Sequence, residues 1–339
     1  FKTPAGRQFL DTIYINQSGE PYTMYIQPSR LHTKYGNIPS ENNEFGNGIN
    51  SYLISNSRHF NNIYLKPNST FQQTNNINMS STNPKLNFTF TGYYHGNNYE
   101  IQNVNLRSHN SSVNFGGMFG KSTGIIADVV MRNLNIDAIS YISTIPNNIV
   151  YVGGIVGINE GSIVRCKVYG NIKAFSTGAN VGGIAGKGSS YENYILDCSN
   201  YAIVSSYGNV GGIVGHISDG LVDSCKHFGE VNLYIYDSIN RSAGGIAGYA
   251  IYTDINYCTV LGMIKYNSPY SSSITLAPRM GNIAGTFKYG LHRNNAITYT
   301  VEFGTLSIIK YKCGLFKTCT WDQRQYVKQF ESMGEYISL

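Results

Sequence analysis

Apolar residues in this chain recur in short runs separated by glycine, asparagine and serine, without the 3.6-residue stripe of an amphipathic helix. One run returns again and again: two glycines, an apolar pair and a third glycine, as in VGGIVG at residues 152–157. The Gly-Gly pairs begin at residues 116, 153, 182, 211 and 244, and a degenerate copy, GNIAG, begins at 281, so the period is 29 to 37 residues. A repeat of this length predicts a solenoid, a propeller or an array.

The composition of each repeat favours one coil of a β-solenoid. Several glycines and many β-branched residues per repeat exclude paired helices, and a four-stranded propeller blade needs about 40 residues. Two or three short strands per coil remain, each stacked in parallel on the previous coil at about 4.8 Å. We therefore expect an all-β fold, a right-handed parallel β-helix. The repeated glycines would mark corners that need a positive φ or have no room for a Cβ.

One cysteine follows each of four Gly-Gly pairs by 13 to 16 residues: Cys166, Cys198, Cys225 and Cys258. Stacked coils would place these four residues in one inner row, where cysteine packs as a small apolar side chain. Parallel stacking brings the Cα atoms within disulfide range but seldom gives the required torsion. We expect a ladder of reduced thiols, with paired disulfides as the alternative.

The repeats also resemble a known family. The strings GGIVG and GGIAG, followed by a turn, a cysteine and G-x-I, are similar to the GLUG repeat of bacterial and protist surface proteins. The segment FTGYYHGNNYEIQNVNL at residues 90–106, followed by NFGGMFG, resembles the lead-in to such repeats, although Tyr94 and His95 stand where an acidic residue is usual. The resemblance covers residues 88–285. It implies a parallel β-helix at a cell surface, as in adhesins and non-catalytic parts of proteases, and implies no reaction.

Four segments are expected along the chain. Residues 1–50 form an irregular N-terminal extension, 51–114 the opening coils, 115–300 the glycine-marked coils, and 301–339 a C-terminal cap. In the last segment Trp321, Tyr326, Phe330 and Met333 recur at helical spacing, which predicts a short amphipathic helix over the final coil. Alternatively, this helix docks another protein, or an open end lets coils of different molecules stack into a filament.

Composition points to a secreted or cell-surface protein. Only 13% of the residues are charged, while 28 are tyrosine and 37 are glycine. The net charge of +6, from 25 basic and 19 acidic residues, is scattered, which excludes the basic cluster of a nucleic-acid-binding protein. No apolar stretch approaches the ~20 residues that cross a bilayer. Because the chain begins with Phe1, we expect a removed leader or a piece of a longer protein.

Two kinds of covalent modification are predicted. Six N-x-S/T sequons occur, although an asparagine-rich chain would produce about five by chance: Asn16, Asn68, Asn78, Asn87, Asn110 and Asn240. Cys313 and Cys319 lie outside the ladder and could close a small loop in an oxidising compartment. Two free thiols are the alternative for this pair.

The sequence gives little support for catalysis. The candidate carboxylates are Asp128, Asp197, Asp223 and Asp254, but their offsets from the repeat cysteine differ, so we expect turn and cap roles for them. The seven histidines show no metal-binding spacing and the cysteines come one per coil, so no metal or cofactor is expected.

The surplus of tyrosine suggests either rings along one outer face that bind sugars or proteins, or ordinary strand residues. Our leading hypothesis is a non-enzymatic extracellular β-solenoid that serves as a structural or adhesive component of a fibre, coat or surface assembly. Its partners would be other proteins, further copies of itself, or glycans. The alternative is a polysaccharide hydrolase or lyase of the parallel β-helix type, and a third possibility is a non-catalytic fragment of a larger secreted enzyme.

Overall fold

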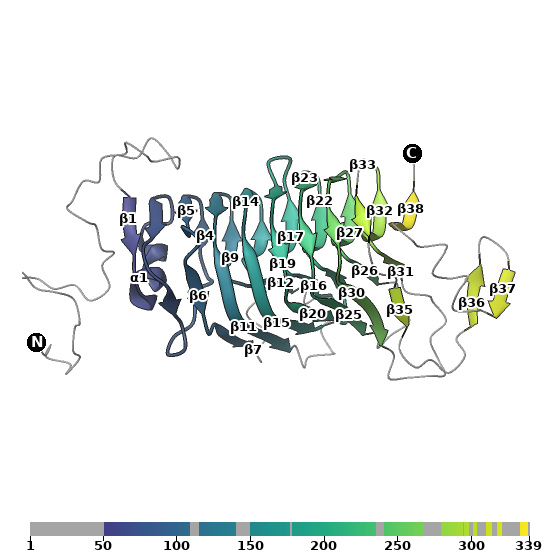
Figure 1. Cartoon of the computed structure of the whole chain (residues 1–339), viewed down its shortest axis with the longest axis horizontal. Helices are drawn as coiled ribbons and strands as arrows, with labels where there is room; N and C mark the ends of the chain where they lie inside the picture. The colour runs from purple at the N-terminus through teal and green to yellow at the C-terminus, as the bar shows by residue number, and fades with distance from the viewer. Residues whose placement is uncertain are drawn as a thin grey trace, which may run out of the picture.

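The chain folds into a parallel β-solenoid, as the repeat predicts (Figure 1). The computed structural model describes residues 51–108, 115–139, 150–176, 178–234, 241–267, 279–293, 295–297, 301–303, 310–313, 317–320 and 333–337. Among these residues, the helical segments are α1 (Ser57–Asn61) and the 3-10 turn η1 (Ile63–Leu65), both beside the first coils. Residues 1–50 of the predicted extension lie outside the described part.

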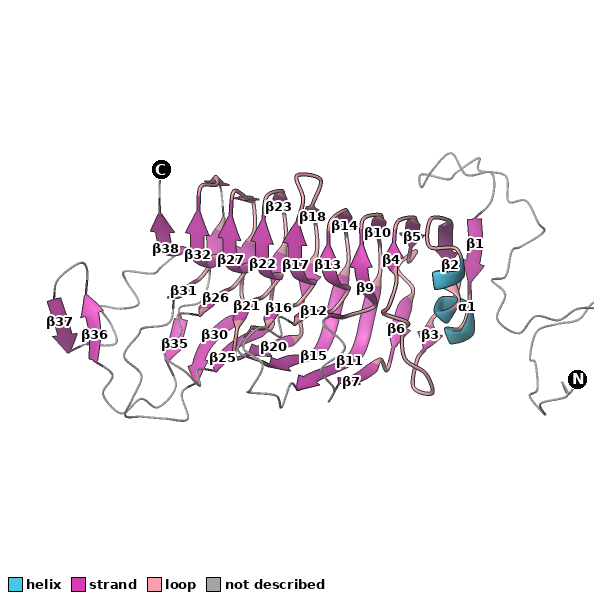
Figure 2. Cartoon of the chain, turned by 180° about the vertical axis from the view of Figure 1, so that it is seen from behind, coloured by secondary structure: helices cyan, strands magenta, loops and turns pink. Residues whose placement is uncertain are grey.

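Four parallel sheets run along the solenoid (Figure 2). The nine-stranded sheet contains β1 (Ser51–Ile54), β2 (Thr70–Gln73), β5 (Tyr93–His95), β10 (Ile125–Ala127), β14 (Ser162–Val164), β18 (Tyr194–Leu196), β23 (Leu221–Asp223), β28 (Asp254–Asn256) and β33 (His292–Arg293). The eight-stranded sheet contains β4 (Thr89–Phe90), β9 (Phe119–Ser122), β13 (Val156–Asn159), β17 (Ala185–Ser189), β22 (Val214–Ser218), β27 (Ala247–Ile251), β32 (Ala284–Lys288) and β38 (Met333–Ile337).

The other two parallel sheets complete each coil. The six-stranded sheet contains β8 (Phe115–Gly116), β12 (Tyr151–Gly153), β16 (Asn180–Gly182), β21 (Asn209–Gly211), β26 (Ser242–Gly244) and β31 (Arg279–Gly281). The thirteen-stranded sheet contains β3 (Ile77–Asn78), β6 (Glu100–Gln102), β7 (Asn105–Ser108), β11 (Val130–Ile139), β15 (Lys167–Phe175), β19 (Ser199–Asn200), β20 (Ile203–Ser206), β24 (Lys226–His227), β25 (Glu230–Tyr234), β29 (Thr259–Val260), β30 (Met263–Asn267), β34 (Ala296–Ile297) and β35 (Val301–Phe303).

Each glycine-marked coil visits the four sheets in the same order, for example through β12, β13, β14 and β15. The coil therefore has four or five strands, more than the two or three expected, because the corners are tight and the strands short. Stacking in register aligns the centres of successive strands, so that Ile126 pairs with Ile163 and Ile163 with Ile195. These side chains are fully buried and form one column of a continuous core.

The glycine pairs serve close packing between coils. A Cβ on Gly154 would lie 2.5 Å from the Gly183 carbonyl oxygen and 2.6 Å from Val168 Cγ1. A Cβ on Gly183 would lie 2.2 Å from the Gly212 carbonyl oxygen. Of the two reasons expected for these glycines, lack of room is therefore the one that applies here.

The C-terminal segment differs from the expected helical cap. Met333 begins strand β38, which pairs in parallel with β32 through Ala284, so the helix prediction is wrong at this residue. Apolar residues three or four positions apart can also occur in a strand that buries only some of them. Here the pairing with β32 makes the segment from Met333 a strand. The other predicted helix residues, Trp321, Tyr326 and Phe330, lie outside the described part.

Candidate functional site

The outer face of the nine-stranded sheet presents two rows of side chains. In the first row Ile125, Ser162, Tyr194, Leu221 and Asp254 are in register. The second row lies two residues further along each strand and contains Ala127, Val164, Leu196, Asp223 and Asn256. Ile125 is 40% exposed and Tyr194 38% exposed, so this face is open to solvent among the described residues. The first coils of this face are polar, with Thr70, Gln72 and His95, and the later coils form a second polar part, with Asp223, Asp254 and Asn256.

Two strongly exposed tyrosines border the second polar part of this face. Tyr252 stands at the corner before β28 and Tyr257 at the corner after it, and they are 54% and 55% exposed. Both have a positive φ, 51° and 52°, as does Tyr289 one coil beyond Tyr252, at 53°. Bulky side chains rarely adopt this left-handed conformation, and each instance costs about 1 kcal/mol or more. The chain therefore holds tyrosine at corners where asparagine, aspartate or glycine would be less strained.

Other coils show what these corners usually contain. The residue before each ladder cysteine is left-handed: Arg165, Asp197, Ser224 and Tyr257 have φ between 52° and 54°. The backbone N–H of each bonds to the next coil, for example Asp197 N to the Asp223 carbonyl oxygen at 3.0 Å. The stacking of coils thus sets the left-handed conformation, whichever side chain stands at this position, and it does not require tyrosine. The position before each ladder cysteine could have been recognised in the sequence as a left-handed corner, because it holds Asp197 in one repeat. Tyr257 occupies the same position in a later repeat.

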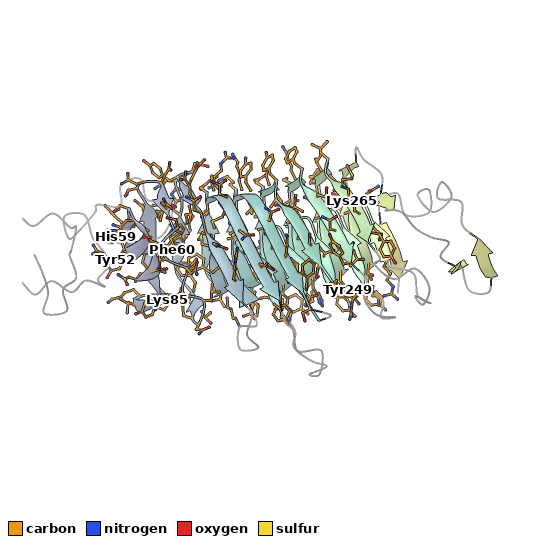
Figure 3. All side chains as sticks on the ribbon, turned by 90° about the horizontal axis from the view of Figure 1, so that it is seen from below. Tyr52, His59, Phe60, Lys85, Tyr249 and Lys265 are labelled. Carbon is orange, nitrogen blue, oxygen red and sulfur yellow. The ribbon has the colours of Figure 1, made fainter. Side chains whose placement is uncertain are left out.

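The ring of Tyr252 is held by a neighbour. Tyr252 and Tyr289 stack with ring centroids 5.1 Å apart and an interplanar angle of 25°. Figure 3 shows how densely side chains cover the outside of the solenoid, with Tyr249 labelled on the coil that carries Tyr252. A stacked ring loses less freedom on binding than an isolated one, so Tyr252 is preorganised.

Polar groups lie between the two tyrosines. Asp254 Oδ1 accepts a hydrogen bond from the backbone N–H of Leu291 at 2.9 Å. Among the described residues, Asp254 Oδ2 and the side chain of Asn256 make no hydrogen bond within the protein. Asp223 Oδ1, on the preceding coil, accepts from Ser224 Oγ at 2.6 Å. Asn256 Oδ1 is buried without a partner among these residues, so the groups that remain available to a ligand are Asp254 Oδ2 and Asn256 Nδ2.

The four candidate aspartates do not form a catalytic group. Asp128 and Asp197 occupy the corner before the cysteine position two coils apart, which is about 10 Å between Cα atoms. Asp223 and Asp254 share the outer face of the nine-stranded sheet, on neighbouring strands and two residues out of step. This stagger gives about 8 Å between their Cα atoms. The sequence did not predict that these two would meet on one face.

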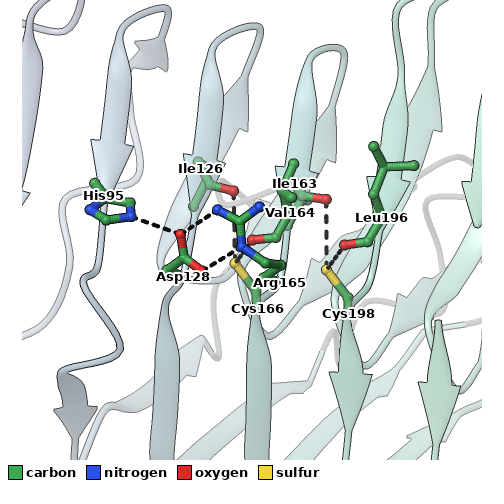
Figure 4. A network of polar contacts seen from close by, with 9 residues as sticks. All are labelled: His95, Ile126, Asp128, Ile163, Val164, Arg165, Cys166, Leu196 and Cys198. Carbon is green, nitrogen blue, oxygen red and sulfur yellow. Dashed lines mark hydrogen bonds and ion pairs between the residues drawn. The ribbon is translucent and has the colours of Figure 1, made fainter. Parts of the chain in front are cut away.

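Asp128 belongs to a polar network that bridges three coils (Figure 4). His95 Nε2 donates to Asp128 Oδ2 at 2.7 Å, and Arg165 donates to both carboxylate oxygens, each at 2.7 Å. Burial would raise the pKa of Asp128, but the hydrogen bonds from Arg165 and His95 outweigh it and the pKa lies below its usual range. Both oxygens are occupied, so this network ties the coils together and offers no free base.

A run of three stacked rings beside the thirteen-stranded sheet is also structural. Tyr169 and Tyr201 stack at 4.4 Å, Tyr201 and Phe228 at 4.6 Å, both nearly parallel. The guanidinium carbon of Arg132 lies 3.8 Å from the Tyr169 ring centroid and covers the end of the stack. Because the ring faces are covered by stacking, this surface presents the ring edges and hydroxyls to solvent. This column of two tyrosines and one phenylalanine stabilises the stacking of coils, and a row of tyrosines that binds a partner stays a prediction.

The ladder cysteines line one interior column, as Figure 4 shows for Cys166 and Cys198. All four are fully buried and free: Cys166, Cys198, Cys225 and Cys258. Each Sγ donates to backbone carbonyl oxygens, as Cys166 does to Val164 at 3.4 Å. Burial raises the pKa of the Cys166 and Cys225 thiols. These thiols serve packing and are protected from reagents in the folded chain.

The remaining predicted sites fall partly within the described residues. Asn68, Asn78 and Asn87 are exposed, whereas Asn16, Asn110 and Asn240 lie outside the described part. Cys313 and Cys319 lie on β36 (Lys310–Cys313) and β37 (Lys317–Thr320), an antiparallel pair whose register sets Cys319 opposite Tyr311. The two cysteines are diagonal in this register, and their disulfide remains a prediction.

The described residues hold neither a candidate metal site nor a candidate membrane-spanning helix. No group of three or more His, Cys, Asp or Glu side chains there could hold a metal ion. No helix there is long and apolar enough to cross a membrane.

Comparison with known proteins shows the fold and nothing finer. No protein-family model matches the chain, and no curated protein matches it. The chain is similar to a crystal structure from Bacteroides ovatus described as a "putative immunoglobulin A1 protease", with a TM-score of 0.59 and 20% sequence identity. The match covers 86% of this chain and 86% of that one. At this identity the likeness concerns the β-solenoid architecture alone.

Proposed function

We propose that this chain is a non-enzymatic β-solenoid of a cell surface or secreted assembly, and that the outer face of its nine-stranded sheet binds the partner. The observation that carries the proposal is the pair Tyr252 and Tyr257, exposed on a rigid scaffold at a backbone cost. Strained residues persist where something other than local stability retains them. The resemblance of the glycine repeats to GLUG repeats supports a surface location.

The scaffold suits binding better than chemistry. The side chains of the face are fixed by parallel strands that stack in register over successive coils. This face and its corners carry several exposed aromatic and apolar groups, including Ile125, Tyr194 and Tyr257, and such groups are common at interaction surfaces. The proposed partners are other structural chains, further copies of this chain, or glycans.

Crosslinking tests the proposal directly. A photoreactive residue at Tyr252 of the full chain, compared with one at Lys173 on the thirteen-stranded sheet, is irradiated in the native material and analysed by mass spectrometry. We expect recurrent links to the same partner from position 252 and none from 173. Equal labelling from both positions, or a solitary chain, would contradict the proposal.

One observation favours a second candidate, a polysaccharide hydrolase. Asp223 and Asp254 face the same side of the sheet with Cα atoms about 8 Å apart, and inverting glycosidases hold their carboxyl groups at a comparable separation. If the chain is such an enzyme, it releases new reducing ends from a polysaccharide and Asp223→Ala or Asp254→Ala abolishes the release. The binding proposal expects no release from the unmodified chain.

A further inference from the structure

We propose that the surface of β28 is a glycan-binding subsite, built from Tyr252, Asp254, Asn256 and Tyr257, and selective for uncharged sugars. This inference rests on the proposed binding function and names its ligand. The two tyrosines stand at opposite ends of one short strand, five residues apart, and their left-handed corners make the separation shorter than the roughly 16 Å of a fully extended chain. Asp254 and Asn256 lie half-buried on the outer side of this strand, with Asn256 Oδ1 buried.

The aromatic groups supply apolar surface for sugar rings. Tyr252 and Tyr257 are more than half exposed, and Tyr252 stacks one ring face on Tyr289, whereas the Tyr169 and Tyr201 rings are covered on both faces. Tyr252 is additionally fixed by its stack on Tyr289. Exposed, preorganised rings at two ends of a polar strip match a ligand that alternates apolar ring faces with hydroxyl edges.

The polar groups between the rings match those hydroxyls. A carboxylate oxygen accepts hydrogen bonds, and the nitrogen of an amide donates them. Asp254 Oδ2 and Asn256 Nδ2 make no hydrogen bond among the described residues, whereas Asn256 Oδ1 is buried and Asp254 Oδ1 is anchored by Leu291 N–H at 2.9 Å. Asp254 is thus oriented by the next coil and keeps one oxygen free for a sugar hydroxyl.

Charge at the subsite distinguishes among ligands. Two carboxylates, Asp223 and Asp254, lie on this part of the face, and Arg293 is the nearby cation on the next strand. An anionic polysaccharide would be repelled by the carboxylates, whereas an uncharged one would not. The core of a protein interface is depleted of charged residues, so carboxylates at the centre of the patch also disfavour a protein partner here.

Titration calorimetry on the full chain tests the assignment. The probes are uncharged hexasaccharides of β-1,4-linked glucose, xylose, mannose and N-acetylglucosamine, with hexagalacturonate as the anionic comparison. We expect one or more uncharged probes to bind and hexagalacturonate to bind more weakly. Tyr252→Asn, Tyr257→Asn and Asn256→Ala should each weaken binding about tenfold. Asparagine tolerates the left-handed corner, so the tyrosine variants should fold.

The control is Tyr191→Asn, since Tyr191 is the most exposed tyrosine of the described residues, at 83%, and lies outside the subsite. It should leave affinity unchanged. The assignment is overturned if no uncharged probe binds at millimolar concentration, or if the subsite variants bind as tightly as the unmodified chain. Should position 252 still crosslink to a protein in those cases, the glycan assignment fails while the proposed binding function stands.

Discussion

At the scale of single residues, Tyr257 combines exposure with a left-handed backbone. Replacing it by asparagine keeps the corner and removes most of the strain, so Tyr257→Asn should raise the free energy of unfolding by about 1 kcal/mol. The matched variant Tyr201→Asn removes a ring that is stacked on both sides, and it should lower the free energy of unfolding by about 1 kcal/mol. Denaturant titration of both variants measures the difference. A loss of stability in Tyr257→Asn would mean that the ring serves packing.

His227 makes the core sensitive to acid. It occupies the inner column between Asn200 and Val260, with Nδ1 3.2 Å from Asn200 Nδ2, and burial lowers its pKa to about 3. The half-buried His216 has its pKa lowered to about 4, by burial and then by Lys187. In the unfolded chain both have ordinary pKa values near 6.5 and take up protons first. Stability is therefore complete above about pH 6.5 and falls as the pH drops toward 4.

The size of this effect can be measured through the urea midpoint at pH 7 and pH 5. Each histidine should contribute a loss approaching about 1.4 kcal/mol per pH unit below its unfolded pKa. The variant His227→Asn places asparagine where the previous coil already has Asn200, and it should lose about half of the pH dependence. A pH dependence identical to that of the unmodified chain would show that His227 is not the buried neutral group.

At the scale of elements, the glycine pairs decide how closely two coils approach. Gly116 and Gly153 are the first glycines of adjacent repeats in the sequence, but in the structure Gly116 pairs with Val152. A Cβ on Gly153 would lie 2.3 Å from the Val156 carbonyl oxygen. A Cβ on Gly116 would meet only side-chain carbons, at 3.7 Å or more. Gly153→Ala should therefore cost about 3 kcal/mol or more, and Gly116→Ala less than about 1 kcal/mol. Thermal melts that rank the two variants the other way would refute this explanation.

The sequence predicted the elements that repeat and missed those that depend on corner geometry. The Gly-Gly period and the cysteine offset were enough to predict parallel coils and a buried cysteine column. The number of strands per coil was underestimated, because two-residue strands such as β19 leave no pattern of alternation. Asp223 and Asp254 meet on one face because each stands an even number of residues before its ladder cysteine, two and four respectively, and side chains alternate along the strand. The left-handed tyrosines are visible in the sequence only once the corner position is known.

At the scale of the whole molecule, the solenoid is a stack in which each coil contacts its neighbours, so its stability should vary along the axis. Four successive coils each carry one fully buried free cysteine, whose exposure reports the opening of its coil: Cys166, Cys198, Cys225 and Cys258. Beyond the coil that carries Cys258, the described residues form one further set of strands, β31 to β35, and then β38, whereas Cys166 has several coils on each side. Opening should therefore begin nearer the C-terminal coils.

Alkylation by a maleimide under native conditions, followed by peptide mass spectrometry, tests this order. We expect Cys258 to react first, then Cys225 and Cys198, with Cys166 last, because exposure requires the coils above each thiol to separate. Dilute urea should widen the differences, since it promotes partial opening before global unfolding. If all four thiols react at one common rate, the solenoid opens as a single cooperative unit and neighbouring coils are coupled more strongly than a stack with nearest-neighbour contacts allows.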